Sequence, residues 1–110
     1  MKVINIIEES IKSNLESIRP PEHIRDQLDI GYTFENNVLI LSEIRPSFMD
    51  KDKIMNIEFA KAKYFKSKEI WQIYWKRANG NWDLYQIPEV SNVDAFFKIV
   101  KEDKLNCFFG

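Results

Sequence analysis

Apolar residues recur with a helical period at both ends of this chain and with a strand period between them. Near the N-terminus, isoleucine and leucine return every three or four residues among serines, lysines and glutamates. This stripe consists of Ile4, Ile7, Ile11, Leu15 and Ile18. A second stripe follows Pro88 and consists of Val93, Phe96, Phe97 and Val100. Both patterns predict amphipathic helices, the first over about residues 2–18.

The middle of the chain alternates between apolar and polar residues, which is typical of antiparallel strands. Asn36-Asn37 and Asn79-Gly80 tolerate the positive φ that tight hairpin turns require. A short helix over EHIRDQL is expected after Pro20-Pro21, and residues 46–56 are expected to form a loop. Strands are predicted over residues 32–35, 38–45, 58–66, 69–78 and 81–88. The chain is therefore expected to be a single α+β domain over residues 1–110, an antiparallel meander of about five strands with both terminal helices on one face.

The turns predict which side chains share a face of the sheet. A turn at Ser67-Lys68 places small residues opposite large ones, as close packing requires. The expected pairs are Ala60 with Trp75, Ala62 with Ile73, and Tyr64 with Trp71. We assign this face to the core, with Trp75 at its centre. A two-residue turn at Asn79-Gly80 further predicts the pairs Arg77 with Trp82, Trp75 with Leu84, and Ile73 with Gln86.

The opposite face of the predicted sheet interleaves lysines with aromatic rings. Lysines neutralise phosphates and rings stack on bases, so this pattern favours a surface for single-stranded nucleic acid or an acidic protein. The candidate binding residues are Lys61, Lys63, Gln72, Tyr74, Lys76 and Tyr85. The simpler interpretation is a solvated sheet face on which Lys76 pairs with Asp83 and Tyr74 packs on Tyr85. A register shift of one residue would exchange the two faces.

Composition and charge narrow the function classes. The 110 residues are 45% hydrophobic and 30% charged, with a net charge of −1, so no field of the whole molecule attracts nucleic acid or membrane. The single cysteine, Cys107, excludes an intramolecular disulfide and suits a reducing compartment. The sequence shows no signal peptide and no apolar run of the roughly 20 residues that span a bilayer. A cytoplasmic protein without membrane contact is expected.

Catalytic chemistry has little support in the sequence. Arg19, His23, Arg25 and Arg45 are candidates for an anion site, since arginines bind carboxylates and phosphates through two parallel hydrogen bonds. The alternative is a set of internal salt bridges. The candidate partners for those bridges are Asp26, Asp29, Glu43 and Asp103. No motif places a nucleophile beside His23 and Asp26, and one histidine with one cysteine does not make a standard zinc site. No catalytic residue, metal site or cofactor is assigned.

Three functions follow from these patterns. The first is a non-enzymatic binding module that uses the lysine-rich face of the sheet. The second is a protein-interaction or homodimerisation module that uses the N-terminal helix or a sheet edge. The third is a small anion-binding protein or enzyme built around His23 and the arginines.

Several blocks of the sequence also resemble a known family. RPPEHIRDQLDIGY, EIRP, KAKYFKSKEIWQIYWKRANGNW and the closing KEDKLNCFFG are similar to a group of small bacterial proteins catalogued as domain of unknown function 3024. The similarity covers about residues 18–110, and CFFG is its most specific part. It implies a compact bacterial cytoplasmic protein and transfers no catalytic or binding residue to this chain.

Overall fold

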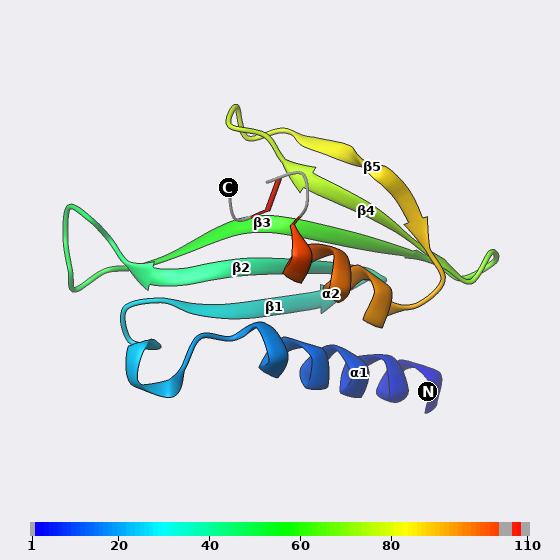
Figure 1. The fold of residues 1–110 in the computed structure, drawn as a ribbon, viewed down its shortest axis with the longest axis horizontal. Helices are drawn as coiled ribbons and strands as arrows, with labels where there is room; N and C mark the ends of the chain where they lie inside the picture. The colour runs from blue at the N-terminus through cyan, green and yellow to red at the C-terminus, as the bar shows by residue number, and fades with distance from the viewer. Residues whose placement is uncertain (1, 104–106, 109–110) are drawn as a thin grey trace.

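The computed structural model of the protein describes residues 2–103, 107 and 108, and it shows five strands and two α-helices in these residues. The strands form one antiparallel sheet in the order β1-β2-β3-β4-β5. The elements are α1 (Lys2–Ile18), a 3₁₀ turn η1 (Glu22–Ile24), β1 (Asp29–Glu35), β2 (Val38–Pro46), β3 (Ile54–Phe65), β4 (Ile70–Lys76), β5 (Trp82–Val90) and α2 (Val93–Glu102). The predicted α+β meander with a helix at each end is confirmed (Figure 1).

Both helices lie on the same face of the sheet and form the core with it (Figure 1). The predicted stripe of α1 buries Ile11 and Leu15, and the stripe of α2 buries Phe96 and Phe97. Each large apolar side chain that leaves water contributes about 1.5–3 kcal/mol, so these positions account for the docking of the helices. Asn92 caps α2, because its Oδ1 accepts a hydrogen bond from the Ala95 N–H at 2.8 Å.

The predicted turn and pairing of β1, β2, β3 and β4 are largely as expected. Asn36 and Asn37 have φ values of 52° and 64°, as a two-residue hairpin turn requires. The three pairs predicted between β3 and β4 all form. The centre of the core differs, however: Trp71 is 3% exposed and packs on Tyr64, whereas Trp75 is only partly buried. Trp71 therefore takes the central role that was predicted for Trp75.

The predicted register between β4 and β5 is wrong by one residue. Lys76 lies opposite Trp82, because the hairpin loop spans Arg77 to Asn81 and the Arg77 N–H donates to the Asn81 carbonyl at 2.8 Å. Side chains alternate between faces with a period of two, so this shift exchanges the faces of the first part of β5; the register changes again between Tyr74 and Gln72, and Gln72 lies opposite Glu89. Tyr85 consequently lies on the core side, 4% exposed, with its ring centroid 5.1 Å from that of Phe108.

Two further segments differ from the prediction. The helix expected over EHIRDQL is reduced to the single turn η1. The loop predicted over residues 46–56 is shorter in the structure, because β2 extends to Pro46 and β3 begins at Ile54. A β-bulge interrupts the β2–β3 pairing, where Leu41 lies opposite Ala60 but Ser42 lies opposite Glu58.

Candidate nucleic-acid interface

The face of the sheet opposite the two helices gathers most of the lysines and rings that the sequence singled out. We call this surface the open face and define it by Lys61, Lys63, Gln72, Tyr74, Lys76 and Trp82. Three cross-strand pairs position these side chains: Lys61 with Tyr74, Lys63 with Gln72, and Lys76 with Trp82. Because paired residues of neighbouring antiparallel strands point to the same side, the six side chains share one surface.

Lys61 is at the centre of the open face and contacts two aromatic rings. Its ammonium nitrogen lies 4.8 Å from the ring centroid of Tyr74 and 5.0 Å from that of Trp82. Lys76 lies 5.5 Å from the same Trp82 ring, and Lys63 lies 5.9 Å from the ring of Phe65. All four distances are within the range of cation–π attraction. Lys61, Lys76, Tyr74 and Trp82 therefore form one connected cluster on this face, and Lys63 with Phe65 forms a separate pair.

The charge of Lys61 is poorly compensated. Burial lowers the pKa of its side chain, the nearby Lys63 lowers it further, and Glu58 acts in the opposite direction. Glu58 itself forms an ion pair with Lys76, at 3.6 Å. Among the residues that the structure describes, no carboxylate forms an ion pair with Lys61. A partly dehydrated ammonium that contacts two ring faces and forms no ion pair in the described residues is suited to receive an anion.

Five of the six predicted binding residues lie together on the open face, and Tyr85 does not. Within this group the Tyr74 hydroxyl donates a hydrogen bond of 2.7 Å to Gln72 Oε1. Leu84 lies opposite Tyr74, where Tyr85 was predicted, and Trp82 lies opposite Lys76, where Asp83 was predicted, so sequence reasoning missed Trp82 as a residue of this face. The sequence signal for the β4–β5 turn was the Asn79-Gly80 pair. This pair also occurs in hairpin loops longer than two residues, so it did not determine which face Trp82 would join.

The two contacts expected from the simpler interpretation do not form as predicted. Asp83 accepts a hydrogen bond from Arg77 at 3.0 Å, not from Lys76, and Tyr74 lies opposite Leu84 rather than Tyr85. Lys76 faces Glu58 and the Trp82 ring instead. Both corrections have the same cause, the one-residue shift of β5.

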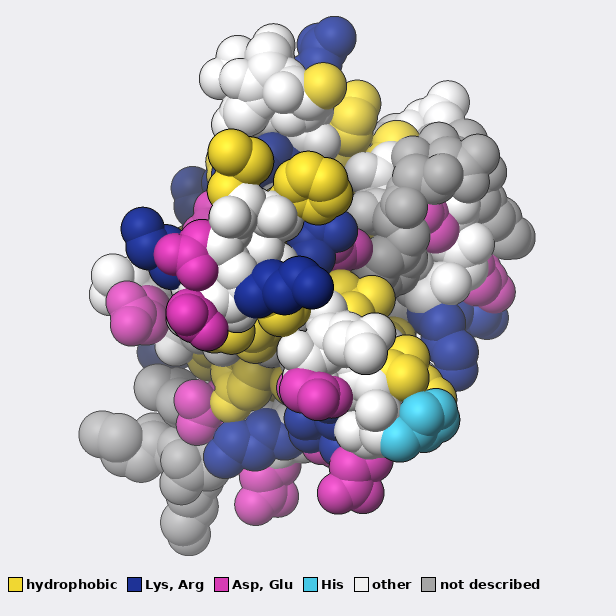
Figure 2. Space-filling model, turned by 90° about the vertical axis from the view of Figure 1, so that its left-hand side faces the viewer, with side chains coloured by type: hydrophobic (Ala, Val, Ile, Leu, Met, Phe, Trp, Pro, Cys, Tyr) yellow, Lys and Arg dark blue, Asp and Glu magenta, His cyan; other side chains and the backbone are white. Residues whose placement is uncertain are grey.

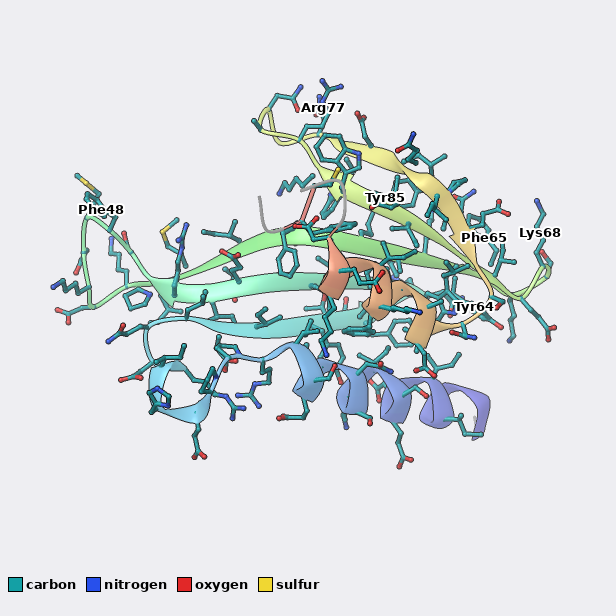
Figure 3. The ribbon with its side chains drawn as sticks, in the orientation of Figure 1. Phe48, Tyr64, Phe65, Lys68, Arg77 and Tyr85 are labelled. Atoms are coloured by element: carbon teal, nitrogen blue, oxygen red, sulfur yellow. The ribbon has the colours of Figure 1, made fainter. Side chains whose placement is uncertain are left out.

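The open face is mixed in charge, and its lysines concentrate along β3. Lys61 and Lys63 are followed by Lys66 and Lys68 in the exposed loop between β3 and β4. Figure 3 shows Lys68 in this loop and Arg77 in the β4–β5 loop, at opposite ends of β4. The carboxylates on or beside the open face are Glu35, Glu58 and Glu89, placed by the pairs Glu35 with Val38, Ser42 with Glu58, and Gln72 with Glu89.

Arg19 and Arg25 of the predicted anion cluster belong to an internal ion-pair network. Arg19 donates to both carboxylate oxygens of Asp29, at 2.9 and 2.8 Å, and also to Glu16 at 2.7 Å. These contacts raise the pKa of Arg19, and the guanidinium lowers the pKa of Asp29. Arg25 donates to the Pro20 carbonyl at 2.9 Å. Of the four carboxylates expected as partners, Asp29 is confirmed, and Glu16 was not anticipated.

His23 and Arg45 are not part of this network. His23 is exposed on η1, where Figure 2 shows the histidine side chain at the surface, and Arg45 is exposed near the end of β2. Within the described part of the chain, no three histidine, cysteine or carboxylate side chains gather as metal ligands. In the same residues, no helix has the length and apolar character needed to cross a bilayer.

Comparison with known proteins identifies the family of the chain and no nearer relative. No curated protein and no solved structure matches it significantly. One family model, described as "Domain of unknown function (DUF3024)", matches residues 2–110, which is nearly the whole chain. The chain therefore belongs to the DUF3024 family.

Proposed function

We propose that the protein is a non-enzymatic binding module that holds single-stranded nucleic acid on the open face. The observation that carries this proposal is Lys61, a partly buried cation that contacts the rings of Tyr74 and Trp82 and forms no ion pair among the described residues. A phosphate beside this ammonium would supply the missing negative charge. Release of counterions from the nucleic acid would add to the affinity.

The aromatic rings favour nucleic acid over an acidic protein. A carboxylate needs only the ammonium groups, whereas a nucleobase also stacks on a ring, at about 1–3 kcal/mol per base. Trp82, Tyr74 and Phe65 each lie beside a lysine. A nucleotide could therefore place its phosphate at the lysine and stack its base on the neighbouring ring. Lys61 and Lys63 are alternate residues of one strand, about 6.7 Å apart along it, and both point to this face.

The mixed charge of the face sets the expected character of the binding. Glu58 neutralises Lys76, and Glu35 and Glu89 repel phosphate from two edges. We expect moderate, salt-dependent affinity without preference for one base, because stacking and charge neutralisation are tolerant of sequence.

The test is fluorescence polarisation of labelled mixed-sequence single-stranded DNA and RNA at low and moderate salt. A variant carrying Lys61→Glu, Lys63→Glu and Lys76→Glu is compared with a control carrying Lys12→Glu, Lys98→Glu and Lys101→Glu. The control makes the same change in net charge at exposed positions of the two helices. The proposal expects the open-face variant to lose binding and the control to retain most of it.

Three results would overturn the proposal. One is the absence of saturable binding by the wild-type protein even at low salt. Another is an equal loss of affinity in both triple variants, since that would show an effect of net charge rather than of the open face. Binding of an acidic peptide with the oligonucleotides inert would also contradict it.

A further inference from the structure

In the middle strand of the sheet, one side of Ile54–Glu58 has no strand partner among the residues that the structure describes. β3 pairs with β2 from Ile54 onwards, but it pairs with β4 only from Ala60 to Phe65. The Lys53 carbonyl accepts from the Ser47 N–H at 2.7 Å, so the backbone of Lys53 is directed toward β2. Backbone groups alternate in direction along a strand. The N–H and C=O groups of the following even-numbered residues are therefore directed away from β2, namely those of Ile54, Asn56 and Glu58.

In the described part of the chain, no strand pairs with this side of Ile54–Glu58. A cavity of about 700 Å³ lies beside it. Its lining includes Asn56 and Glu58 of β3 and Arg77 of the β4–β5 hairpin, and Cys107 and Phe108 near the C-terminus also line it. Figure 1 shows this hairpin turning away from β3, and Ile54, Met55 and Asn56 are exposed. A row of unpaired backbone groups is a template for another strand.

The exposed apolar residues of the described chain concentrate at the same end of β3. Ile54 and Met55 are 60% and 43% exposed, and Phe48 and Met49 in the adjoining β2–β3 loop are 97% and 90% exposed. Figure 2 faces this end of the molecule and shows hydrophobic side chains at its surface. Proteins usually protect a free strand edge with charged residues, proline or a covering segment. An edge flanked by exposed apolar side chains is instead typical of an interface.

We propose that a second copy of this chain pairs with the free edge of β3, antiparallel and centred on Asn56. The sequence of the edge is complementary to itself in this register. Asn56 lies opposite Asn56, Ile54 opposite Glu58, and Met55 opposite Ile57, so apolar Met55 and Ile57 meet on one face. The outward-directed residues are symmetric about Asn56, and a two-fold axis there pairs all of their backbone groups in the two copies.

The same register accounts for the apolar loop and the cavity. In this register Lys53 of one copy lies opposite Phe59 of the second copy. Phe59 lines the cavity, so the loop Ser47–Lys53 of the first copy lies next to the cavity of the second. Phe48 and Met49 at the tip of that loop are thereby brought toward the cavity wall around Ala78. The proposed dimer does not involve Lys61, Tyr74 or Trp82, although its cavity adjoins the open face at Lys76, and it does not depend on nucleic-acid binding.

Sedimentation velocity over a range of concentrations tests the dimer. The wild-type protein is expected to approach twice the 13.1 kDa mass of the chain, and a variant with Ile54→Lys and Met55→Lys is expected to remain a monomer. Ile87→Lys is the matched control, because Ile87 is similarly exposed, at 55%, and lies on β5. A wild-type monomer at several hundred micromolar would overturn the proposal, and so would a dimer that the double substitution leaves intact.

Cysteine cross-linking tests the register without disturbing the apolar residues. In a Cys107→Ser background, Asn56→Cys is expected to form a disulfide dimer rapidly under mild oxidation, because directly paired residues have Cα atoms about 5.5 Å apart. Ile54→Cys lies opposite Glu58 and is expected to cross-link at least tenfold more slowly. Equal rates for the two variants, or no cross-link at Asn56→Cys, would contradict antiparallel pairing about Asn56.

Discussion

Lys61 and Trp82 are contributed by β3 and β5, and the ammonium of Lys61 lies 5.0 Å from the centroid of the Trp82 ring. β4 lies between these strands and contributes Tyr74, whose ring centroid is 4.8 Å from the same ammonium. This contact across three strands joins the charge of the open face to its largest ring. It depends on the five-residue loop between β4 and β5, since a two-residue turn would direct Trp82 to the core side.

Trp82→Ala is expected to weaken binding of single-stranded oligonucleotides about 5- to 150-fold, which corresponds to the loss of one stacked base at about 1–3 kcal/mol. Leu84→Ala is the control, because Leu84 also lies on β5, is half exposed, and offers no ring. Polarisation titrations at one fixed salt concentration measure both affinities. Equal affinities of the two variants would show that Trp82 does not stack on a base.

Trp71→Ala is expected to lower the free energy of unfolding by about 3–5 kcal/mol, the usual cost of removing a large buried aromatic side chain. Trp71 is 3% exposed and contacts the rings of Tyr64 and Phe34. Trp75→Ala is expected to cost less, because Trp75 is only partly buried. Urea denaturation of the two variants shows which one loses more free energy of unfolding. A larger loss for Trp75→Ala would contradict this assignment and make Trp75 the centre of the core.

Asp29→Asn is expected to make stability less dependent on pH in the acidic range. The hydrogen bonds from Arg19 lower the pKa of Asp29 in the folded protein. A carboxylate with a lowered pKa stabilises the fold above its ordinary pKa of about 3.9, and this stabilisation is lost as the pH falls through the lower, folded value. Urea midpoints of wild type and variant should therefore differ at pH 6 and converge at low pH. A constant difference across this range would contradict the role of the pair.

Cys107 is expected to react slowly with iodoacetamide in the folded protein. Burial raises the pKa of its thiol, and the carboxylate of Asp103 raises it further. Only the thiolate is nucleophilic, so a raised pKa lowers the reactive fraction at neutral pH. Alkylation measured at pH 7.5 should accelerate at least tenfold when urea unfolds the protein. An equal rate in the folded protein would show that Cys107 is not protected.

The helices, the strands and the β3–β4 pairing could be predicted from the sequence, because more than one physical signal supported each of them. Ala60 and Ala62 leave room for Trp75 and Ile73, so size complementarity and turn position favoured the same register. Between β4 and β5 only the Asn79-Gly80 pair was available, and it does not determine the loop length. An error of one residue exchanged Trp82 for Tyr85 in the candidate site.

The extension of β3 could not be predicted for a different reason. Ile54, Met55 and Asn56 are all exposed, so they show no alternation between buried and solvated positions, and Pro46 indicated an early end to the pairing of β2. Only their pairing with β2 places these three residues in a strand. The free edge of β3 and its flanking cavity were consequently visible only in the structure.

The most direct test of the account is a titration of the ¹⁵N-labelled protein with a short single-stranded oligonucleotide, followed through its backbone and indole N–H resonances. The account predicts shifts at Lys61, Lys63, Tyr74 and Trp82, with the resonances of α1 and α2 unchanged. Shifts confined to the Arg19–Arg25 region or to the helices would contradict it, and so would an unchanged spectrum at millimolar oligonucleotide.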